Sequence, residues 1–285
     1  MTITAYRVEV FGAKADKGNP AVVVLGAEER PELLQAIATK AAVSDTAFIW
    51  PDPTSSRVKI RWFTPKAETT LCGHATLAAA RVLRESDAAS PLIEFESARD
   101  RLIVTHEGGL DWLTLPPPVI EPLDRPRQSI ADALQIWGSE TELKLPTELT
   151  PERDLIIPLS LAADLYHIEP DFELLAKLGR EWNVRGFCLL DRKHRDPDVN
   201  FAIRFFAPHY GIPEDPATGS VVGPLALYAV KHGWAAKSDS PLRLQFEQGA
   251  GLGRPCRLHV EFAGPGMPVL VGGLTSVPAA MTLGV

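Results

Sequence analysis

The chain has 285 residues, of which 45% are hydrophobic and 23% charged, and its formal net charge is -7 at pH 7. This composition is typical of a folded protein with a buried core, in one large domain or two medium ones, and it argues against disorder. The acidic balance and the lack of long like-charge runs exclude a nucleic-acid or anionic-membrane surface, so a small molecule is the expected partner.

The N-terminal segment alternates apolar and polar residues (MTITAYRVEVFG), which predicts a first strand rather than a signal peptide. No apolar run approaches the roughly 18 residues needed to span a bilayer. The cysteines Cys72, Cys188 and Cys256 are widely spaced and form no C-x-x-C pair. They indicate neither a disulfide framework nor a thiolate zinc site, and we expect a cytoplasmic protein.

The chain contains an internal repeat. Residues 58–65 read VKIRWFTP and residues 201–208 read FAIRFFAP, so that an Ile, an Arg, a Phe and a Pro recur at one offset, about half the chain. A proline followed by an acid opens a helix-like stretch in each half, at 31 and at 170. Since a fixed offset between similar segments marks repeated structural units, the sequence predicts two related lobes.

Apolar spacing and Gly/Pro punctuation predict, in each half, strands, a helix, more strands and a second helix. The helices are expected at 31–42 and 73–86 in the first half and at 171–182 and 219–232 in the second. The fold class is therefore α+β, with two pseudo-symmetric lobes. A proline-rich stretch at 115–126 (LPPPVIEPLDRP) suits a connector. We place the lobes at 1–117, with the last strand near 277–285 as a further candidate member, and at 118–285.

Each half carries a chemically active residue nine positions after the repeated phenylalanine: Cys72 in the first and Asp215 in the second. Both residues precede an expected helix. A helix start offers unpaired N–H groups and partial positive charge, so two facing helix starts would suit a carboxylate or an enolate-like intermediate.

Small and hydroxyl residues surround these two corners. Gly73 and Gly219 would allow a ligand to approach the backbone closely. Thr218 and Ser220 could cap the second helix or bond the substrate.

Each candidate also has an ordinary interpretation. Cys72 could be an activated thiolate, but pocket lining is the commoner role. His74 could be catalytic or a structural hydrogen-bonder. Asp215 could be a helix N-cap, and Asp45 could be a turn residue that bonds its own backbone. The residues alone leave these alternatives open.

Other histidines show no metal-ligand spacing, and no Walker loop is present. The glycine-rich segment at 249–255 (GAGLGRP) lies between two strand-like runs and is typical of a hairpin rather than a phosphate-binding loop. No cofactor and no metal are expected.

Six motifs together resemble the phenazine-biosynthesis PhzF-like family of isomerases. They are KGNPAVVV (17–24), SDTAF (44–48), RWFTP with LCGHATLAAA (61–80), NVRGFC (183–188), EDPATGS (214–220) and EQG with GRP (247–255). The resemblance implies a fold similar to diaminopimelate epimerase, in which each lobe wraps a curved, mostly antiparallel sheet around a central helix. It also implies an active site between the lobes and a homodimer.

The resemblance also implies site roles: a base that moves a proton between carbons, assisted by a histidine, an aspartate and a serine. These roles fall on Asp45, His74, Asp215 and Ser220, with substrate contacts at Ser44, Gly73 and Gly219. The family's base is a glutamate, whereas Asp45 has a carboxylate arm shorter by one carbon–carbon bond, about 1.5 Å. The second cysteine of diaminopimelate epimerase is replaced by Asp215, which disfavours a two-cysteine racemase.

The leading hypothesis is a cofactor-independent isomerase that shifts a proton between carbons of a small carboxylic acid bound between two lobes. One alternative is a catalytically weak ligand-binding or regulatory member of the same fold. Another is an epimerase that uses Cys72 and Asp215 as its two bases.

Overall fold

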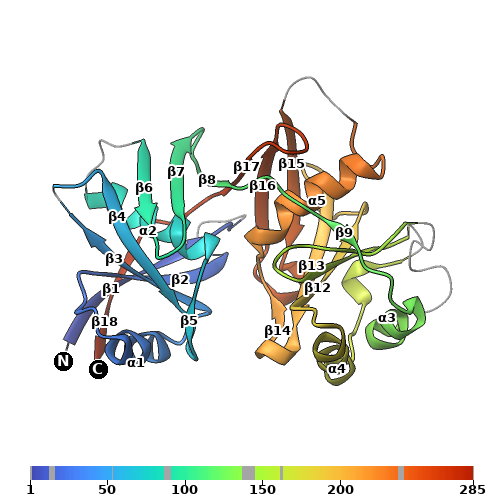
Figure 1. Ribbon diagram of the computed structural model, residues 1–285, viewed down its shortest axis with the longest axis horizontal. Helices are drawn as coiled ribbons and strands as arrows, with labels where there is room; N and C mark the ends of the chain where they lie inside the picture. Colours follow the sequence, from blue (N-terminus) through green and yellow to red (C-terminus); the bar gives the residue numbers. More distant parts are fainter. Residues whose placement is uncertain are drawn as a thin grey trace. The chain divides into compact units, whose positions relative to one another are not determined.

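The computed structural model describes residues 2–12, 17–52, 54–86, 91–136, 145–160, 163–236 and 241–284. The chain forms two compact units. Unit 1 comprises Met1–Leu115 together with Leu270–Val285, and unit 2 comprises Pro116–Val269. The C-terminal segment therefore returns to unit 1, where the last strand pairs with the first (Figure 1).

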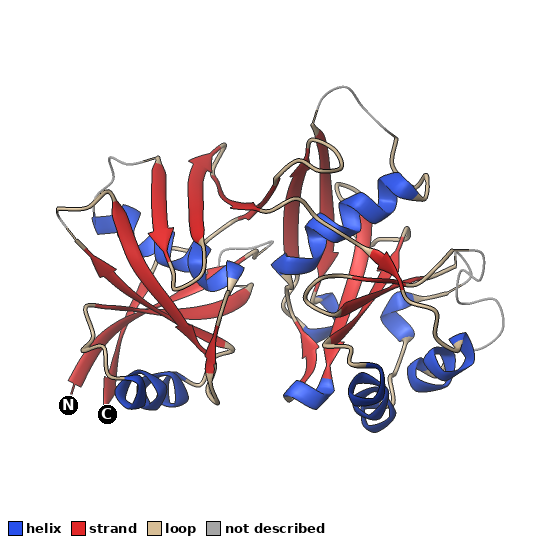
Figure 2. Ribbon diagram, viewed as in Figure 1, coloured by secondary structure: helices blue, strands red, loops and turns tan. Residues whose placement is uncertain are grey.

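Unit 1 is built on one sheet whose strands follow the order β18-β1-β2-β3-β4-β6-β7-β8-β17, with β5 paired to the end of β4. Helix α2 lies among these strands, and α1 packs against β3 and β18 (Figures 1 and 2). The elements are β1 (Thr2–Val10), β2 (Asn19–Leu25), α1 (Pro31–Ala41), β3 (Asp45–Pro51), β4 (Arg57–Phe63), β5 (Glu68–Thr69), α2 (Gly73–Ser86), β6 (Leu92–Glu96), β7 (Arg101–Glu107), β8 (Leu110–Leu115), β17 (Val269–Gly273) and β18 (Ala279–Gly284).

In unit 2 the strand order is β9-β10-β11-β12-β13-β15-β16, with β14 paired to the end of β13. The elements are β9 (Glu121–Pro122), α3 (Arg127–Leu134), β10 (Glu148–Leu149), β11 (Asp154–Pro158), η1 (Leu165–His167), α4 (Phe172–Trp182), β12 (Gly186–Asp191), β13 (Phe201–Ala207), η2 (Pro208–Tyr210), β14 (Ile212–Asp215), α5 (Gly219–Lys231), β15 (Leu242–Gln248), η3 (Ala250–Leu252) and β16 (Cys256–Phe262).

The two units repeat one pattern of pairing. In unit 1, β2 and β3 are parallel and joined by α1, β3 and β4 are antiparallel, and β4 and β6 are parallel and joined through α2. In unit 2, β11 and β12 are parallel around α4, β12 and β13 are antiparallel, and β13 and β15 are parallel around α5. The predicted α+β class is confirmed, and the four predicted helices lie within one residue of their expected bounds.

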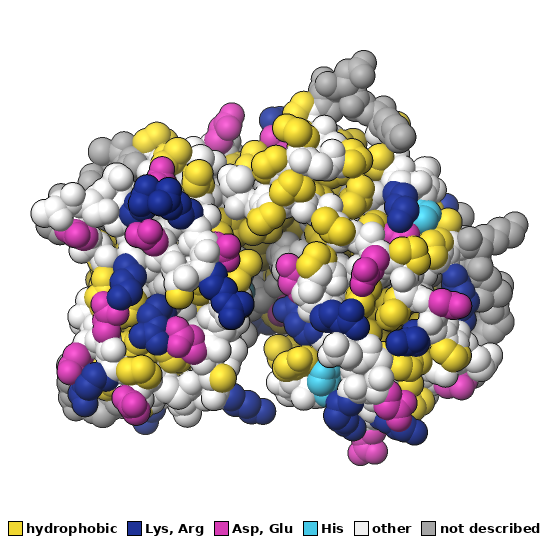
Figure 3. Space-filling model, in the orientation of Figure 1, with side chains coloured by type: hydrophobic (Ala, Val, Ile, Leu, Met, Phe, Trp, Pro, Cys, Tyr) yellow, Lys and Arg dark blue, Asp and Glu magenta, His cyan; other side chains and the backbone are white. Residues whose placement is uncertain are grey.

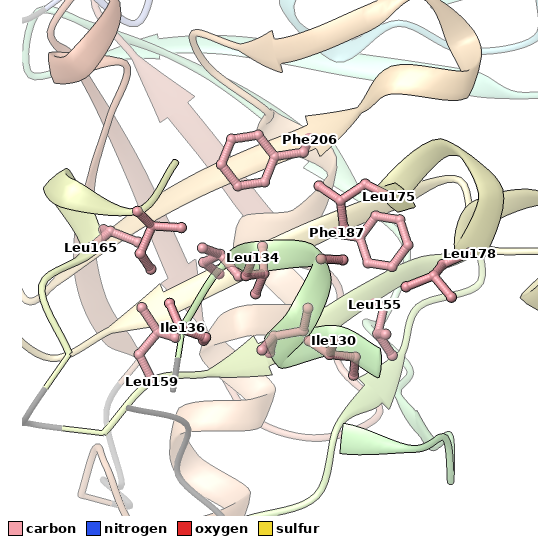
Figure 4. Packing of buried hydrophobic residues seen from close by; sticks show 14 of the residues in the cluster. Ile130, Leu134, Ile136, Leu155, Leu159, Leu165, Leu175, Leu178, Phe187 and Phe206 are labelled. Carbon is pink, nitrogen blue, oxygen red and sulfur yellow. The ribbon is translucent and has the colours of Figure 1, made fainter. Parts of the chain in front are cut away.

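A pair of phenylalanines on neighbouring strands lies in the core of each unit. In unit 1, Phe48 on β3 meets Phe63 on β4 edge to face, with ring centroids 5.4 Å apart. In unit 2, Phe187 and Phe206 are opposed on β12 and β13 and belong to the cluster drawn in Figure 4. All four rings are at most 2% exposed. Burying rings of this size supplies a large share of core stability, which explains why these positions recur.

Helix α5 is apolar on most of its surface, and eight of its thirteen residues are buried. A helix that is hydrophobic nearly all round must be enclosed by other elements. In Figure 2 it lies among the strands of unit 2, and it packs against β16. By contrast α4 is amphipathic: Asp171 caps its first turn by accepting a hydrogen bond from the Leu174 amide at 2.9 Å, and Leu175 and Leu178 face the core.

Among the described residues, no helix is both long and apolar enough to cross a bilayer. Basic and acidic side chains are interspersed on the face shown in Figure 3.

Candidate active site

The catalytic candidates of unit 1 converge where β3 and α2 begin. Asp45 is the first residue of β3, and His74 is the second residue of α2. The Nε2 atom of His74 lies 3.3 Å from the Ser44 hydroxyl and 3.9 Å from Oδ2 of Asp45. The side chains of His74 and Asp45 are only 10% and 16% exposed. This arrangement puts an acid and an imidazole side by side in a largely buried corner.

The opposite nitrogen of the same imidazole contacts a thiol. Nδ1 of His74 lies 3.3 Å from Sγ of buried Cys72. The backbone at this point is held by Thr76, whose hydroxyl donates to the Cys72 carbonyl at 2.7 Å and accepts from the indole of Trp62 at 3.1 Å. These buried bonds fix the backbone at Cys72, and the His74 ring lies with the Cys72 thiol at one nitrogen and Ser44 and Asp45 at the other.

Asp45, Cys72 and His74 also meet the distance requirement for a cation site, because one ligand atom from each lies within 4.8 Å of the others. Thiolate, imidazole and carboxylate are the ligands that Zn²⁺ accepts. The imidazole nitrogens, however, face different partners: Nδ1 faces Cys72 and Nε2 faces Asp45. An ion would therefore bind only one of the two nitrogens, and the other would keep its present neighbour.

Gly73 precedes the histidine and lies at the start of α2. A Cβ added here would meet only one atom, Cδ2 of Leu113 at 3.4 Å, which is ordinary contact. Neither packing nor backbone strain therefore requires glycine at this position. A ligand that approaches the amide of this residue gives a reason for it.

In unit 2, Asp215 ends β14 and Thr218 stands immediately before α5. As the predicted helix bounds imply, Cys72 directly precedes α2, whereas Asp215 lies four positions before Gly219, the first residue of α5. Of the two alternatives for Thr218, helix capping by its side chain is wrong, because the hydroxyl makes no capping hydrogen bond. That hydroxyl donates instead to Oδ2 of Asp215 at 2.7 Å.

Gln248, at the end of β15, holds this loop in place. Its amide nitrogen donates to the Asp215 carbonyl at 2.7 Å and lies 3.1 Å from the Thr218 hydroxyl. Its amide oxygen accepts from the backbone N–H of Thr218 at 2.9 Å. The side chain is 2% exposed, so these bonds are protected from water.

Gly249 explains the glycine of the EQG motif. Its φ angle is +76°, and a Cβ there would lie 2.5 Å from the Arg254 carbonyl oxygen and 2.6 Å from the Pro216 carbonyl oxygen. Only glycine permits the loop before α5 to pack this closely. The segments EDPATGS and EQG therefore pack directly against each other.

Ser220, the second residue of α5, accepts a hydrogen bond from Nη2 of Arg185 at 3.1 Å. The guanidinium is paired with Asp154, through Nε to Oδ1 at 2.8 Å and through Nη2 to Oδ2. Asp154 is fully buried, and this burial raises the pKa of its carboxyl group to about 6 despite the opposing effect of Arg185.

The structure thus brings Ser44, Asp45, Gly73 and His74 together in unit 1, and Asp215, Gly219 and Ser220 together in unit 2. Sequence reasoning assigned no role to Asp154, Arg185 or Gln248. Arg185 and Gln248 lie inside quoted motifs, which is a usable signal. Asp154 opens an apolar strand (DLIIP), and nothing in the sequence indicated that its carboxylate is buried.

A separate cavity of about 180 Å³ lies within unit 2 and is lined by residues that include Tyr166, Arg204, Glu247 and Gln248. The polar groups there are bonded to one another: Arg204 is paired with Glu214, and Glu247 accepts from Tyr166 and two backbone amides. None of the catalytic candidates lines this cavity.

Two repeated α+β units, each with a helix start that carries polar side chains, define the epimerase-like class of isomerase folds. The chain belongs to the PhzC-PhzF family, described as phenazine biosynthesis-like proteins, whose model matches residues 8–273. It is 35% identical to an uncharacterized isomerase of Pseudomonas aeruginosa over 93% of both chains. It is 30% identical to the uncharacterized isomerase YddE of Escherichia coli O157:H7, over 90% of this chain and 88% of that one. These similarities indicate an isomerase.

Solved structures show the same fold. A PhzF-family protein of Enterococcus faecalis superposes with a TM-score of 0.83 at 28% identity, and the match covers all of both chains. A hydroxyproline epimerase from Agrobacterium vitis, solved with trans-4-hydroxy-L-proline, has a TM-score of 0.62 at 13% identity, over 99% of this chain and 92% of that one.

Proposed function

We propose that this protein is a cofactor-independent isomerase that shifts a proton between carbons of a small carboxylic acid held between the two units. Asp45 removes a proton from one substrate carbon and returns it to another. His74 relays that proton or polarises the substrate, and Asp215 and Ser220 assist from unit 2. The observation that carries the proposal is the contact between Asp45 and His74 in a corner only 10–16% exposed. A carboxylate beside an imidazole in a largely buried site is suited to proton transfer.

The separation of 3.9 Å between Asp45 and His74 is longer than a hydrogen bond. The Asp45 carboxylate is therefore not committed to the imidazole and can accept a proton from a ligand. Ser44 lies closer to the same nitrogen, at 3.3 Å, so it can orient the ring while Asp45 acts. Carboxylate binding is assigned to the backbone amides at the starts of α2 and α5. The bound hydroxyproline of the Agrobacterium relative supports this substrate class.

Solvent deuterium uptake tests the proposal. Candidate acids, beginning with trans-4-hydroxy-L-proline, are incubated with the protein in heavy water, and ¹H NMR follows the loss of each carbon-bound proton. We expect uptake at one carbon of at least one acid, and its loss in Asp45→Asn. Asp52→Asn, which removes an exposed loop carboxylate, is the matched control. An acid that binds tightly but never exchanges would favour the ligand-binding alternative.

A second candidate function, a two-base epimerase that uses Cys72 and Asp215, is favoured by one observation. The Cys72 thiol lies 3.3 Å from Nδ1 of His74, which could accept its proton and leave a thiolate. This reaction would invert a single carbon, whereas the first candidate moves a proton from one carbon to another. Analysis of the product by chiral chromatography separates the two reactions.

A further inference from the structure

The guanidinium of Arg185 is fixed by more contacts than a surface arginine has. Two of its nitrogens bond Asp154, one of these also bonds Ser220, and its plane lies over the Phe205 ring, 5.7 Å from the centroid. The ring reaches this position because residue 186 is glycine: a Cβ there would lie 2.1 Å from a Phe205 ring carbon. Hydrogen bonds therefore hold the edge of the guanidinium, and the Phe205 ring covers one of its faces.

Asp154 anchors the arginine from inside the unit. It opens β11, pairs with Gly186 on β12, and is fully buried. The Asp154 side chain is 1% exposed, whereas that of Arg185 is 37% exposed. Burying a carboxylate costs free energy that a partly exposed arginine returns only in part. We therefore explain the pair by the fixed position that it gives the guanidinium beside Ser220.

The direction of the bond to Ser220 has a chemical consequence. Arginine has only donors, so the hydroxyl oxygen must accept from Nη2. The hydroxyl hydrogen then points elsewhere, and the nearby positive charge makes it a stronger donor. Ser220 is thereby set to donate, which suits a ligand atom that carries negative charge and opposes a role as a base.

The charged neighbours of the guanidinium are Asp154, Glu152 and Asp215. Asp215 would repel an anionic ligand at the start of α5. The guanidinium beside Ser220 is the positive charge among these carboxylates, and it reduces the repulsion that an anionic ligand would meet near Asp215.

We propose that Arg185, anchored by Asp154, is a positioning residue that holds Ser220 as a hydrogen-bond donor to an anionic oxygen of the ligand. The inference deepens the proposed function and rests on it for the place of Ser220 in the site. It identifies the group that Ser220 contacts as a carboxylate or enolate oxygen rather than a neutral hydroxyl or amine.

Malonate, a small dicarboxylate, is the probe, and malonamide is its uncharged counterpart. Calorimetry compares wild type with Arg185→Lys, Ser220→Ala and the double variant. Lysine keeps the charge but cannot hold Asp154 and Ser220 through one planar fork. We expect each single variant to weaken malonate binding about tenfold or more. The double variant should bind malonate no more weakly than the weaker of the two single variants. Arg61→Lys is the matched control, because Arg61 also pairs with a carboxylate and lies over a ring.

Three results would overturn the inference: malonate that fails to bind wild type, Arg185→Lys that binds malonate normally, or losses that multiply in the double variant. Multiplying losses would mean that Arg185 contacts the anion directly. If Arg185→Lys does not fold, ¹⁵N NMR of wild type decides, since malonate must shift the Arg185 Nε signal and malonamide must not. Failure of the proposed function is separate, because it appears as absent deuterium uptake while malonate still binds.

Discussion

The carboxylate of Asp45 and the imidazole of His74 lie 3.9 Å apart, close enough to share a ligand and too far to satisfy each other. The opposite ring nitrogen of His74 contacts the Cys72 thiol.

The length of the acid at position 45 should be matched to the substrate. Asp45→Glu moves the carboxylate outward by about 1.5 Å. Misplacement of roughly 1 Å costs about 100-fold in rate, so we expect deuterium uptake to fall by about that factor. Uptake that rises in Asp45→Glu would contradict this and would identify the wild-type site as a degraded one.

Cys72 should be dispensable for exchange. In the proposed mechanism the thiol lines the site and contacts the ring, so Cys72→Ala should reduce uptake by less than about tenfold. The rate of uptake at a saturating acid concentration is the measurement. A loss of about 100-fold or more would support the two-base epimerase instead.

Gln248→Ala should loosen the loop that carries Asp215. The substitution removes the amide oxygen that accepts from the buried N–H of Thr218 and the amide nitrogen that donates to the Asp215 carbonyl. Each unsatisfied buried group costs about 1–3 kcal/mol, so the free energy of unfolding in urea should fall by at least that amount. Gln245→Ala, on the same strand, is the control because its side-chain oxygen has no hydrogen-bond partner among the described residues.

Gly249→Ala and Gly253→Ala form a matched pair. Both glycines have positive φ angles, +76° and +66°, so both variants carry the backbone cost of about 1–2 kcal/mol. Only the Cβ at 249 would meet carbonyl oxygens, whereas nothing lies within 4 Å at 253. Thermal unfolding should show a clearly larger loss for Gly249→Ala. Equal losses would disprove the close packing of EQG against EDPATGS.

The contribution of Asp154 to the free energy of unfolding should fall as pH rises between about 4 and 6. Burial raises the pKa of Asp154 from 3.8 to about 6, so over this range the folded state binds more protons than the unfolded state. The contribution of this group is full below pH 3.8 and is lost once pH passes about 6. Urea unfolding should show that the free energy of unfolding falls more steeply with pH over this range in wild type than in Asp154→Asn, and equal slopes would contradict this prediction.

Much of the fold could be predicted because the sequence repeats. The phenylalanines of the two FTP/FAP segments are core anchors, and the helices follow from apolar spacing and from turn residues. The corner in unit 2 was predicted less fully, because the sequence did not reveal β14, which ends at Asp215, or the side-chain contacts of the loop 216–218.

Other features of the site could not be predicted from the chain. The carboxylate of Asp154 reads as the polar end of a strand, and only the packing of β11 beside β12 shows that it meets Arg185. The Gln248 side chain accepts a hydrogen bond from the backbone of Thr218, 30 positions away in the sequence. No spacing rule predicts such a contact.

A crystal structure with an exchanging acid bound tests the central claim most directly. The account predicts that one acid molecule lies within hydrogen-bond distance of His74 and of Ser220, with a carbon atom beside the Asp45 carboxylate. An acid held by one unit alone, with Asp45 turned away from it, would contradict the account.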